Sequence, residues 1–232
     1  MAVRDDTILR VKGLSVSLEH EKVLSNLDFH VKEGEVLMIL GPNGAGKTVL
    51  LRTLLGFLPF SGKIHWKPGL KIGYVPQRLP LIKEIPLSIR EFFYLKKTTG
   101  QEIIESLKLV GLDDSLLDKR IANISSGQFQ RLLIAWALIG NPNVLLLDEP
   151  TSGIDIGGEE TIYSLMARLK KEKNLTIFLV THDLSIVFRQ ASNVLCLNRK
   201  MLCYGIPKKI LNSSNLSQLF GKEASFYQHK HG

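Results

Sequence analysis

The first third of the chain shows the alternation of apolar and polar residues that is typical of β-strands. Between Ile8 and Val31 this alternation predicts two or three antiparallel strands. An apolar run at Val36–Leu40 predicts a strand, and a helix-like segment follows from Lys47 to about Leu55. Two further short strands are expected at Lys63–Trp66 and Lys71–Val75.

The pattern changes from strand to helix after Gln77. A proline-bearing loop, Arg78–Pro86, precedes two segments with helical periodicity, Ile89–Leu95 and Glu102–Val110. We therefore expect residues 77–123 to form a mostly helical lobe. Because strands both precede and follow this lobe, it is interpreted as an insertion into an α/β core.

The rest of the chain alternates between helix and strand. The predicted elements are a helix at Gly127–Ile139, a strand at Val144–Leu147, a helix at Gly158–Lys171, a strand at Thr176–Val180, a helix ending at Gln190, a hairpin of Asn193–Leu197 and Met201–Tyr204, and a helical tail. This alternation predicts a mostly parallel sheet with helices on both sides. At 232 residues we expect one domain, with residues 1–76 and 124–232 as its core and 77–123 as the inserted lobe.

The composition is that of a soluble globular protein rather than a disordered chain. Hydrophobic residues make up 44% and charged residues 22%. With 30 basic and 22 acidic residues, the net charge of +8 suits an anionic membrane surface, a nucleic acid or a polyphosphate. Because the basic residues are scattered along the chain, a solvated basic surface is favoured and no nucleic-acid partner is expected.

Neither a membrane span nor a signal peptide is expected. The longest apolar run, Leu132–Ile139, is far shorter than the ~18 residues of a membrane helix, and Met1–Arg10 lacks an apolar centre. We therefore expect a cytoplasmic chain that reaches a membrane only through a partner. Cys196 and Cys203, seven residues apart, do not have the spacing of a redox or zinc pair and are expected to be packed thiols in a reducing compartment.

One stretch matches the phosphate-loop template G-x-x-x-x-G-K-[ST] at every fixed position. It consists of Gly41, Pro42, Asn43, Gly44, Ala45, Gly46, Lys47 and Thr48. Glycines let backbone N–H groups approach phosphate oxygens, Lys47 suits the β- and γ-phosphates, and the Thr48 hydroxyl suits Mg²⁺. The complete match, between a predicted strand and a predicted helix, disfavours a simple Gly-rich turn without a ligand.

Asp148 and Glu149 end a predicted buried strand, where open α/β sheets bind their ligands. Asp148 is placed to hold the water shell of Mg²⁺, and Glu149 to polarise an attacking water. Such a pair is often just a solvated turn when taken alone. With a phosphate loop upstream, catalysis is the stronger interpretation.

Three further elements have both a structural and a functional interpretation. Ser125–Gln128 opens a helix, either as an ordinary N-cap or as an anion site for a γ-phosphate held by another molecule. His182 follows a buried strand and is either packed, solvated or a γ-phosphate ligand. Gln77 follows a strand and suits Mg²⁺ or a water, although a single glutamine is weak support.

In this order, six motifs resemble those of the ATP-binding cassette (ABC) ATPases over essentially the whole chain. GPNGAGKT at 41–48, YVPQ at 74–77, ISSGQFQR at 124–131, VLLLDEP at 144–150, SGID at 152–155 and THD at 181–183 look like Walker A, Q-loop, signature, Walker B, D-loop and H-loop motifs. The resemblance implies an α/β P-loop NTPase fold of ABC type, with a mostly parallel central sheet, an N-terminal antiparallel β-subdomain and an inserted helical lobe. It also implies an ATPase that forms ADP and phosphate.

In this family two domains sandwich two ATP molecules, each bound by Walker A of one subunit and the signature of the other. The resemblance implies that Lys47 and Thr48 bind the phosphates and Mg²⁺, that Asp148 binds Mg²⁺, and that Gln77 binds Mg²⁺ and couples the lobe to the site. It implies that Glu149 is the general base, that His182 is the γ-phosphate switch, and that Asp155 takes part in communication across the dimer. The residues implied to bind the trans γ-phosphate are Ser125, Ser126, Gly127 and Gln128. The implied cofactors are ATP and Mg²⁺.

Two positions depart from the family pattern. Ser126 stands where the signature usually has its first glycine, so its side chain either hinders close approach to the phosphate or supplies a hydroxyl to it. Leu18 stands where an aromatic residue usually stacks on adenine, which implies looser base selectivity.

Stretches outside the nucleotide motifs are similar to the ATPase subunits of bacterial zinc and manganese uptake transporters. These are LKIGYVPQRL at 70–79 and VLCLNRKMLCYGIPKK at 194–209, with a tail ending in His229-Lys230-His231. The two tail histidines are either metal ligands or, as is more common in such tails, ordinary surface residues.

The resemblance predicts the motor subunit of a divalent-metal importer. The expected assembly is a homodimer on separate integral-membrane permease subunits, peripheral at the cytoplasmic face of the plasma membrane and served indirectly by an extracytoplasmic metal-binding protein. One alternative is an ABC ATPase of another transporter, for a different solute or for export. The other is a soluble ABC ATPase acting on DNA, ribosomes or an assembly process, although such proteins usually carry tandem cassettes or coiled-coil insertions.

Overall fold

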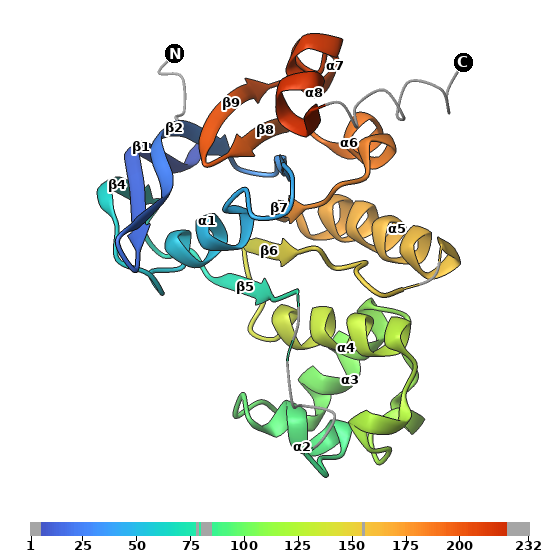
Figure 1. The fold of residues 1–232 in the computed structure, drawn as a ribbon. Helices are drawn as coiled ribbons and strands as arrows, with labels where there is room; N and C mark the ends of the chain where they lie inside the picture. The colour runs from blue at the N-terminus through green and yellow to red at the C-terminus, as the bar shows by residue number, and fades with distance from the viewer. Residues whose placement is uncertain (1–5, 78, 80–84, 155, 222–232) are drawn as a thin grey trace, which may run out of the picture. The chain divides into compact units, whose positions relative to one another are not determined.

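The computed structural model describes residues 6–77, 79, 85–154 and 156–221 (Figure 1). The chain divides into two compact units, and each is described by itself. Met1–Gly69 and Thr176–Gly232 form the first unit, and Leu70–Leu175 forms the second.

The first unit contains an antiparallel sheet with the strand order β2-β1-β4. Its strands are β1 (Thr7–Leu18), β2 (Glu21–Lys32) and β4 (Ser61–Trp66). The predicted alternation is confirmed, because Leu9 and Leu14 are fully buried whereas Arg10 and Lys12 on the same strand are exposed. Glu19 and His20 form the two-residue turn between β1 and β2, both with positive φ, which matches the right-handed twist of a hairpin.

The first unit also contains strands in parallel register. β3 (Val36–Leu40) pairs in parallel with β7 (Thr176–Val180) and β8 (Asn193–Asn198), and β9 (Lys200–Gly205) pairs antiparallel with β8. The helices of this unit are α1 (Lys47–Leu54), α6 (Leu184–Gln190), α7 (Pro207–Ile210) and α8 (Ser213–Phe220). The predicted hairpin and helical tail are thereby confirmed within the described residues.

The second unit combines two parallel strands with four α-helices among its described residues. Its elements are β5 (Ile72–Val75), α2 (Ile89–Tyr94), α3 (Gly100–Leu109), two 3₁₀ turns (Asp114–Leu116 and Ile121–Asn123), α4 (Ser126–Leu138), β6 (Val144–Asp148) and α5 (Ile156–Lys173). β5 and β6 pair in parallel. The mixed α/β class with parallel and antiparallel strands agrees with the sequence prediction.

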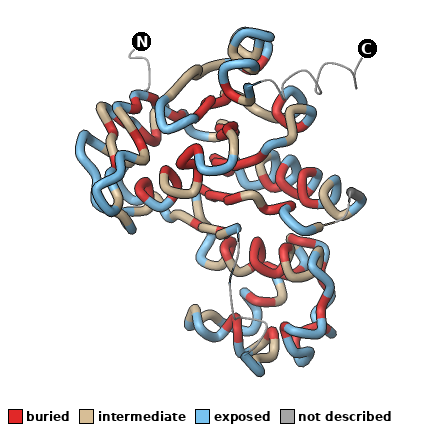
Figure 2. The backbone as a smooth tube through the Cα atoms, in the orientation of Figure 1, coloured by how far each residue is buried: buried red, intermediate tan, exposed pale blue. Residues whose placement is uncertain are grey.

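The strands predicted from continuous apolar runs are buried at every position. These strands are β3, β6 and β7 (Figure 2). Among the residues that the structure describes, we find no helix with both the length and the hydropathy needed to cross a bilayer.

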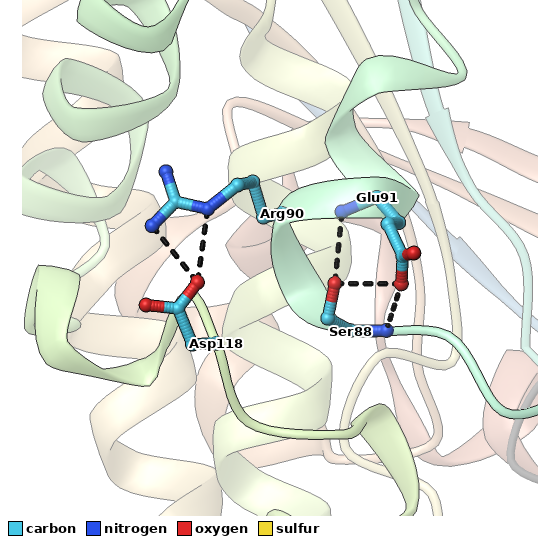
Figure 3. Close-up of polar contacts among 4 residues, drawn as sticks. All are labelled: Ser88, Arg90, Glu91 and Asp118. Carbon is cyan, nitrogen blue, oxygen red and sulfur yellow. Dashed lines mark hydrogen bonds and ion pairs between the residues drawn. The ribbon is translucent and has the colours of Figure 1, made fainter.

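Among the described helix starts of the second unit, those of α2, α3 and α4 form a capping box. In each helix the hydroxyl of the N-cap residue accepts a hydrogen bond from the backbone N–H of the residue three positions later. The side chain of that later residue, a Glu or a Gln, accepts a hydrogen bond from the backbone N–H of the N-cap residue. The N-cap residues are Ser88, Thr99 and Ser125. At the start of α2, Arg90 also pairs with Asp118 at 2.9 Å (Figure 3). Hydrogen bonds from Ser88 lower the pKa of Glu91, and those from Arg90 lower the pKa of Asp118.

The C-terminal end of α2 packs against the C-terminal end of α4. The rings of Phe92 and Trp136 stack with centroids 5.5 Å apart. Lys96 Nζ lies 4.0 Å from the Trp136 ring centroid and donates to Trp136 O at 2.8 Å. Partial burial lowers the pKa of Lys96. These contacts join the two helix ends through both ring stacking and a charged hydrogen bond.

The structure corrects the expectation for the two cysteines. Cys196 in β8 and Cys203 in β9 are opposite each other in the antiparallel register and form a disulfide, with Cα atoms 4.9 Å apart. Spacing along the chain predicts separate packed thiols, which is wrong. The turn at Arg199 folds the two strands together, so that residues seven apart in sequence come face to face.

Candidate nucleotide site

The phosphate loop links β3 to α1 along a path that requires glycine. Gly44 and Gly46 have φ values of +76° and +94°, in the left-handed region that glycine adopts without a steric penalty. A Cβ added to Gly41 would lie 2.1 Å from Leu197 O, and one added to Gly46 would lie 2.6 Å from a Leu24 methyl. Since Gly46 also begins α1, this glycine cradle at a helix N-terminus fits the phosphates of a nucleotide.

Lys47 is folded back onto its own loop. Its side chain is buried, and its Nζ donates to Gly41 O at 2.9 Å and to Pro42 O at 3.0 Å. A phosphate oxygen would compete with these carbonyls for the same donors, and hydrogen bonds between two charged groups are the stronger ones. Thr48 follows in the first turn of α1 and is half-buried.

His182 leaves the neighbouring parallel strand at the same edge as the loop. Ile39 of β3 is opposite Val180 of β7, and Thr181 N donates to Ile39 O at 3.3 Å. The turn around His182 is fixed, because Thr181 Oγ1 accepts from Asp183 N at 3.1 Å and Asp183 caps α6. The His182 side chain is exposed.

In the second unit, Gln77 and Glu149 meet directly. The parallel register places Val75 opposite Leu147, so the residues two positions further on leave β5 and β6 at the same level. Gln77 Nε2 donates to Glu149 Oε2 at 2.7 Å. The sequence offers only weak support for Gln77, whereas the structure brings it into contact with the predicted general base.

Asp148 and Glu149 differ in exposure and in backbone conformation. Asp148 is the last residue of β6 and is 1% exposed. Glu149 is half-buried and has a φ of +46°, which few non-glycine residues adopt. Ser152 N donates to Glu149 O at 3.1 Å and closes the turn that follows.

The signature stretch begins α4 as a regular N-terminus. Ser125 Oγ accepts from Gln128 N at 3.2 Å, and Gln128 Oε1 accepts from Ser125 N at 3.1 Å. Ser125 is confirmed as the N-cap, whereas Ser126 is the first helical residue. Ser126 is exposed and Gly127 is half-buried. A Cβ added to Gly127 would meet no atom within 4 Å.

The predicted site residues therefore fall into two groups. The phosphate loop and His182 belong to the first unit, and Gln77, Asp148, Glu149 and Ser125–Gln128 belong to the second. Asp155, His229 and His231 lie outside the described residues. Leu18 is half-buried at the end of β1, where it pairs with Glu21.

A backbone N–H that contacts the phosphate loop lies outside all the sequence motifs. Arg199, in the turn between β8 and β9, donates its N–H to Ala45 O at 3.0 Å. Its φ of +57° marks a tight turn, but no local signal links that turn to residues more than 150 positions earlier. The contact follows from the pairing of β8 with β3.

Comparison with known proteins identifies the family. The sequence profile described as ABC transporter matches residues 24–152, more than half of the chain. The zinc import ATP-binding protein ZnuC of Pseudomonas savastanoi pv. phaseolicola is 39% identical over 231 residues, covering 97% of this chain and 87% of that protein. ZnuC of Photorhabdus laumondii subsp. laumondii is 37% identical over 231 residues, covering 97% and 90%.

A solved structure agrees with this fold. The structure of cbiO1 from Clostridium perfringens, part of the ABC transporter complex cbiONQ, is 27% identical with a TM-score of 0.78, and the match covers 97% of this chain and 100% of that chain. The ordered motifs, the fold and these relatives together show that the chain belongs to the ABC transporter family, as one of its ATPase subunits.

Proposed function

We propose that this chain is the ATP-hydrolysing motor of a bacterial importer for a divalent metal ion, zinc or manganese. The observation that carries the proposal is that relatives named as zinc import ATP-binding proteins align with 97% of the chain, well beyond its nucleotide motifs. The transported ion is a substrate of the whole transporter and has no required contact with this subunit.

The proposed ligands of the motor are ATP and Mg²⁺. The glycine cradle and Lys47 suit the phosphates, since the loop has the close backbone approach that phosphate oxygens need. Thr48, Gln77 and Asp148 offer the oxygen donors that Mg²⁺ prefers. When bound, Mg²⁺ neutralises charge on the phosphate oxygens.

Glu149 is proposed as the general base, with His182 as a γ-phosphate ligand. The carboxylate suits proton transfer from a water, and its position is set by the turn that Ser152 closes. In the present conformation Oε2 accepts from Gln77. This bond uses one of the two carboxylate oxygens, so a carboxylate has further acceptor sites for a water.

The motor is proposed to work as a nucleotide-sandwich homodimer. At the start of α4 the capping box uses the N–H of Gln128. The amides of Ser126 and Gly127 lie in the same first turn, whose N–H groups lack partners within a helix and favour an anion. We assign these residues, with Ser125, to the nucleotide of a second copy, and Asp155 to communication between the copies.

Exposed apolar side chains in the second unit support a permease partner. Ile85, Tyr94 and Leu95 are 45%, 48% and 64% exposed. Side chains of this size exposed close together in sequence favour a protein contact. We therefore propose that α2 docks on integral-membrane subunits, with the motor at the cytoplasmic face and an extracytoplasmic metal-binding protein upstream.

Metal uptake by cells lacking this gene tests the proposal. Wild-type protein should restore uptake of radioactive zinc or manganese, and Glu149→Gln, made at the same level, should not. Affinity purification of the wild type should recover a multi-spanning membrane protein. Unchanged uptake of both metals, or recovery with ribosomes or DNA, would contradict metal import.

A further inference from the structure

The disulfide of the first unit lies beside the root of the phosphate loop. In the parallel pairing of β3 with β8, Cys196 is opposite Leu40, the residue before Gly41. Cys203 is opposite Cys196 on β9. Residues 197–202, between the two cysteines, therefore form the tip of the β8–β9 hairpin, with its turn at Arg199, next to the place where the loop begins.

The tip of this hairpin contacts the phosphate loop directly. Arg199 N donates to Ala45 O at 3.0 Å, and Arg199 O accepts from Ser25 N at 2.8 Å. Leu197 O lies so close to Gly41 that a Cβ there would come within 2.1 Å of it. The turn thus contacts the loop near its start and at its centre, while it is itself tied to β2.

The two cysteines differ in how far they are exposed to solvent. Cys196 is fully buried, whereas Cys203 is half-buried on β9. Thiol–disulfide exchange requires an incoming thiolate to reach a sulfur atom. Cys203 is therefore the point of attack. A disulfide in a protein of a reducing compartment is usually transient or redox-sensing rather than structural.

We propose that Cys196 and Cys203 form a reversible exchange site for low-molecular-weight thiols, and that its state sets how tightly the phosphate loop binds nucleotide. A thiolate attacks Cys203 Sγ, the S–S bond breaks, and Cys196 leaves as a thiolate that takes up a proton. A second small thiol attacks the mixed disulfide and releases Cys203. The protein disulfide is reduced to two thiols, while two small thiols are oxidised to one disulfide.

The direction of the effect follows from conformational freedom. The closed disulfide restricts the turn at Arg199, so its contacts with Ala45 and Gly41 are already ordered when nucleotide arrives. Opening the disulfide releases the turn, and part of the binding free energy is then used to order it. The coupling rests on the proposed nucleotide site. We expect the disulfide form to bind ATP about three- to tenfold more tightly than the dithiol form.

The test uses the full chain equilibrated with mixtures of glutathione and glutathione disulfide. Alkylation followed by mass spectrometry gives the fraction of each form without nucleotide, and titration calorimetry gives the ATP affinity of each. Cys203→Ser should bind ATP like the reduced wild type and should not respond to the redox buffer. Cys203→Ala serves if the serine variant folds poorly.

Thermodynamic reciprocity sharpens the test. If the disulfide raises ATP affinity by some factor, saturating ATP must shift the exchange equilibrium toward the disulfide by the same factor. Equal ATP affinities of the two forms, or a pair that exchanges only after unfolding in urea, would overturn the proposal. If neither form binds ATP, the proposed function and the coupling both fail. The alkylation experiment still tests separately whether the two cysteines exchange with small thiols.

Discussion

At the scale of single residues, Glu149 combines an uncommon backbone conformation with a direct contact to Gln77. Its φ of +46° costs free energy in most non-glycine residues, and such positions concentrate at functional sites. The Gln77 amide at 2.7 Å holds one carboxylate oxygen. Both features are consistent with a side chain that is positioned for a role rather than for packing.

Replacing Glu149 by glutamine should separate nucleotide binding from turnover. The amide keeps the shape of the side chain but cannot accept a proton, so steady-state phosphate release should fall by about a hundredfold or more while ATP affinity is retained. Glu172→Gln, at an exposed position of α5, is the control. Turnover close to wild type in Glu149→Gln would rule out the assigned base.

Gly41 offers a second test at the same scale. In Gly41→Ala the new Cβ meets Leu197 O at 2.1 Å, so the loop or the β8–β9 turn has to move. We expect at least tenfold weaker ATP binding and a lower melting temperature, since such overpacking costs about 1–3 kcal/mol. Gly100→Ala, where the added Cβ meets nothing within 4 Å, should leave ATP binding unchanged and should not lower the melting temperature. Equal ATP affinities and melting temperatures of the two variants would contradict a close contact between the phosphate loop and the β8–β9 hairpin.

At the scale of helices, the caps of the second unit make its stability sensitive to acid. Glu91, Glu102 and Asp118 all have lowered pKa values, because cap hydrogen bonds or Arg90 favour their charged forms. A carboxylate with a lowered pKa stabilises the folded state above its ordinary pKa. That contribution is lost as the pH falls through the lowered value.

Glu102→Gln tests this dependence at the cap of α3. At pH 7 it should lower the urea midpoint, because Thr99 N and the Thr98 hydroxyl lose a charged acceptor. The difference from wild type should shrink below about pH 4.5 as the wild-type carboxylate is protonated. Glu105→Gln on the same helix provides the comparison. A difference that stays constant with pH would refute the assignment.

At the scale of the whole molecule, the signature serine bears on dimer formation. Ser126 is exposed at the first position of α4, so glycine can replace it without loss of packing. Ser126→Gly, combined with Glu149→Gln to retain ATP, should preserve or raise ATP-dependent dimerisation, as measured by light scattering. A clear loss would show that the Ser126 hydroxyl has become a phosphate ligand. The single Glu149→Gln variant is the reference.

The sequence predicts features that depend on a local pattern of residues, but it does not predict features that depend on which strands pair and in what register. The strand Thr176–Val180 and the Ser125 cap follow from apolar runs and cap chemistry, and the structure confirms both. The Gln77–Glu149 contact and the Arg199–Ala45 bond join residues far apart in sequence. Their geometry depends on strand register, which a single sequence does not specify.

The cysteines show the same limit at short range. Their spacing is compatible with packed thiols or with a cross-strand pair, and only the register of the β8–β9 hairpin decides between them. The sequence predicts the hairpin itself, but not the register shift between Cys196 and Leu197 that brings Cys196 opposite Cys203. The error in the sequence prediction is therefore an error about strand register.

The contacts of Phe92 and Lys96 with Trp136 would transmit a movement of α2 to α4. The helix carries Trp136 near one end and Ser125 at the other, a span of about 17 Å at 1.5 Å per residue. A tilt of about 10° imposed through α2 would therefore carry the Ser125 end through about 3 Å. That distance is about the length of a hydrogen bond, so such a tilt would be enough to make or break the contact that we propose between the start of α4 and a phosphate.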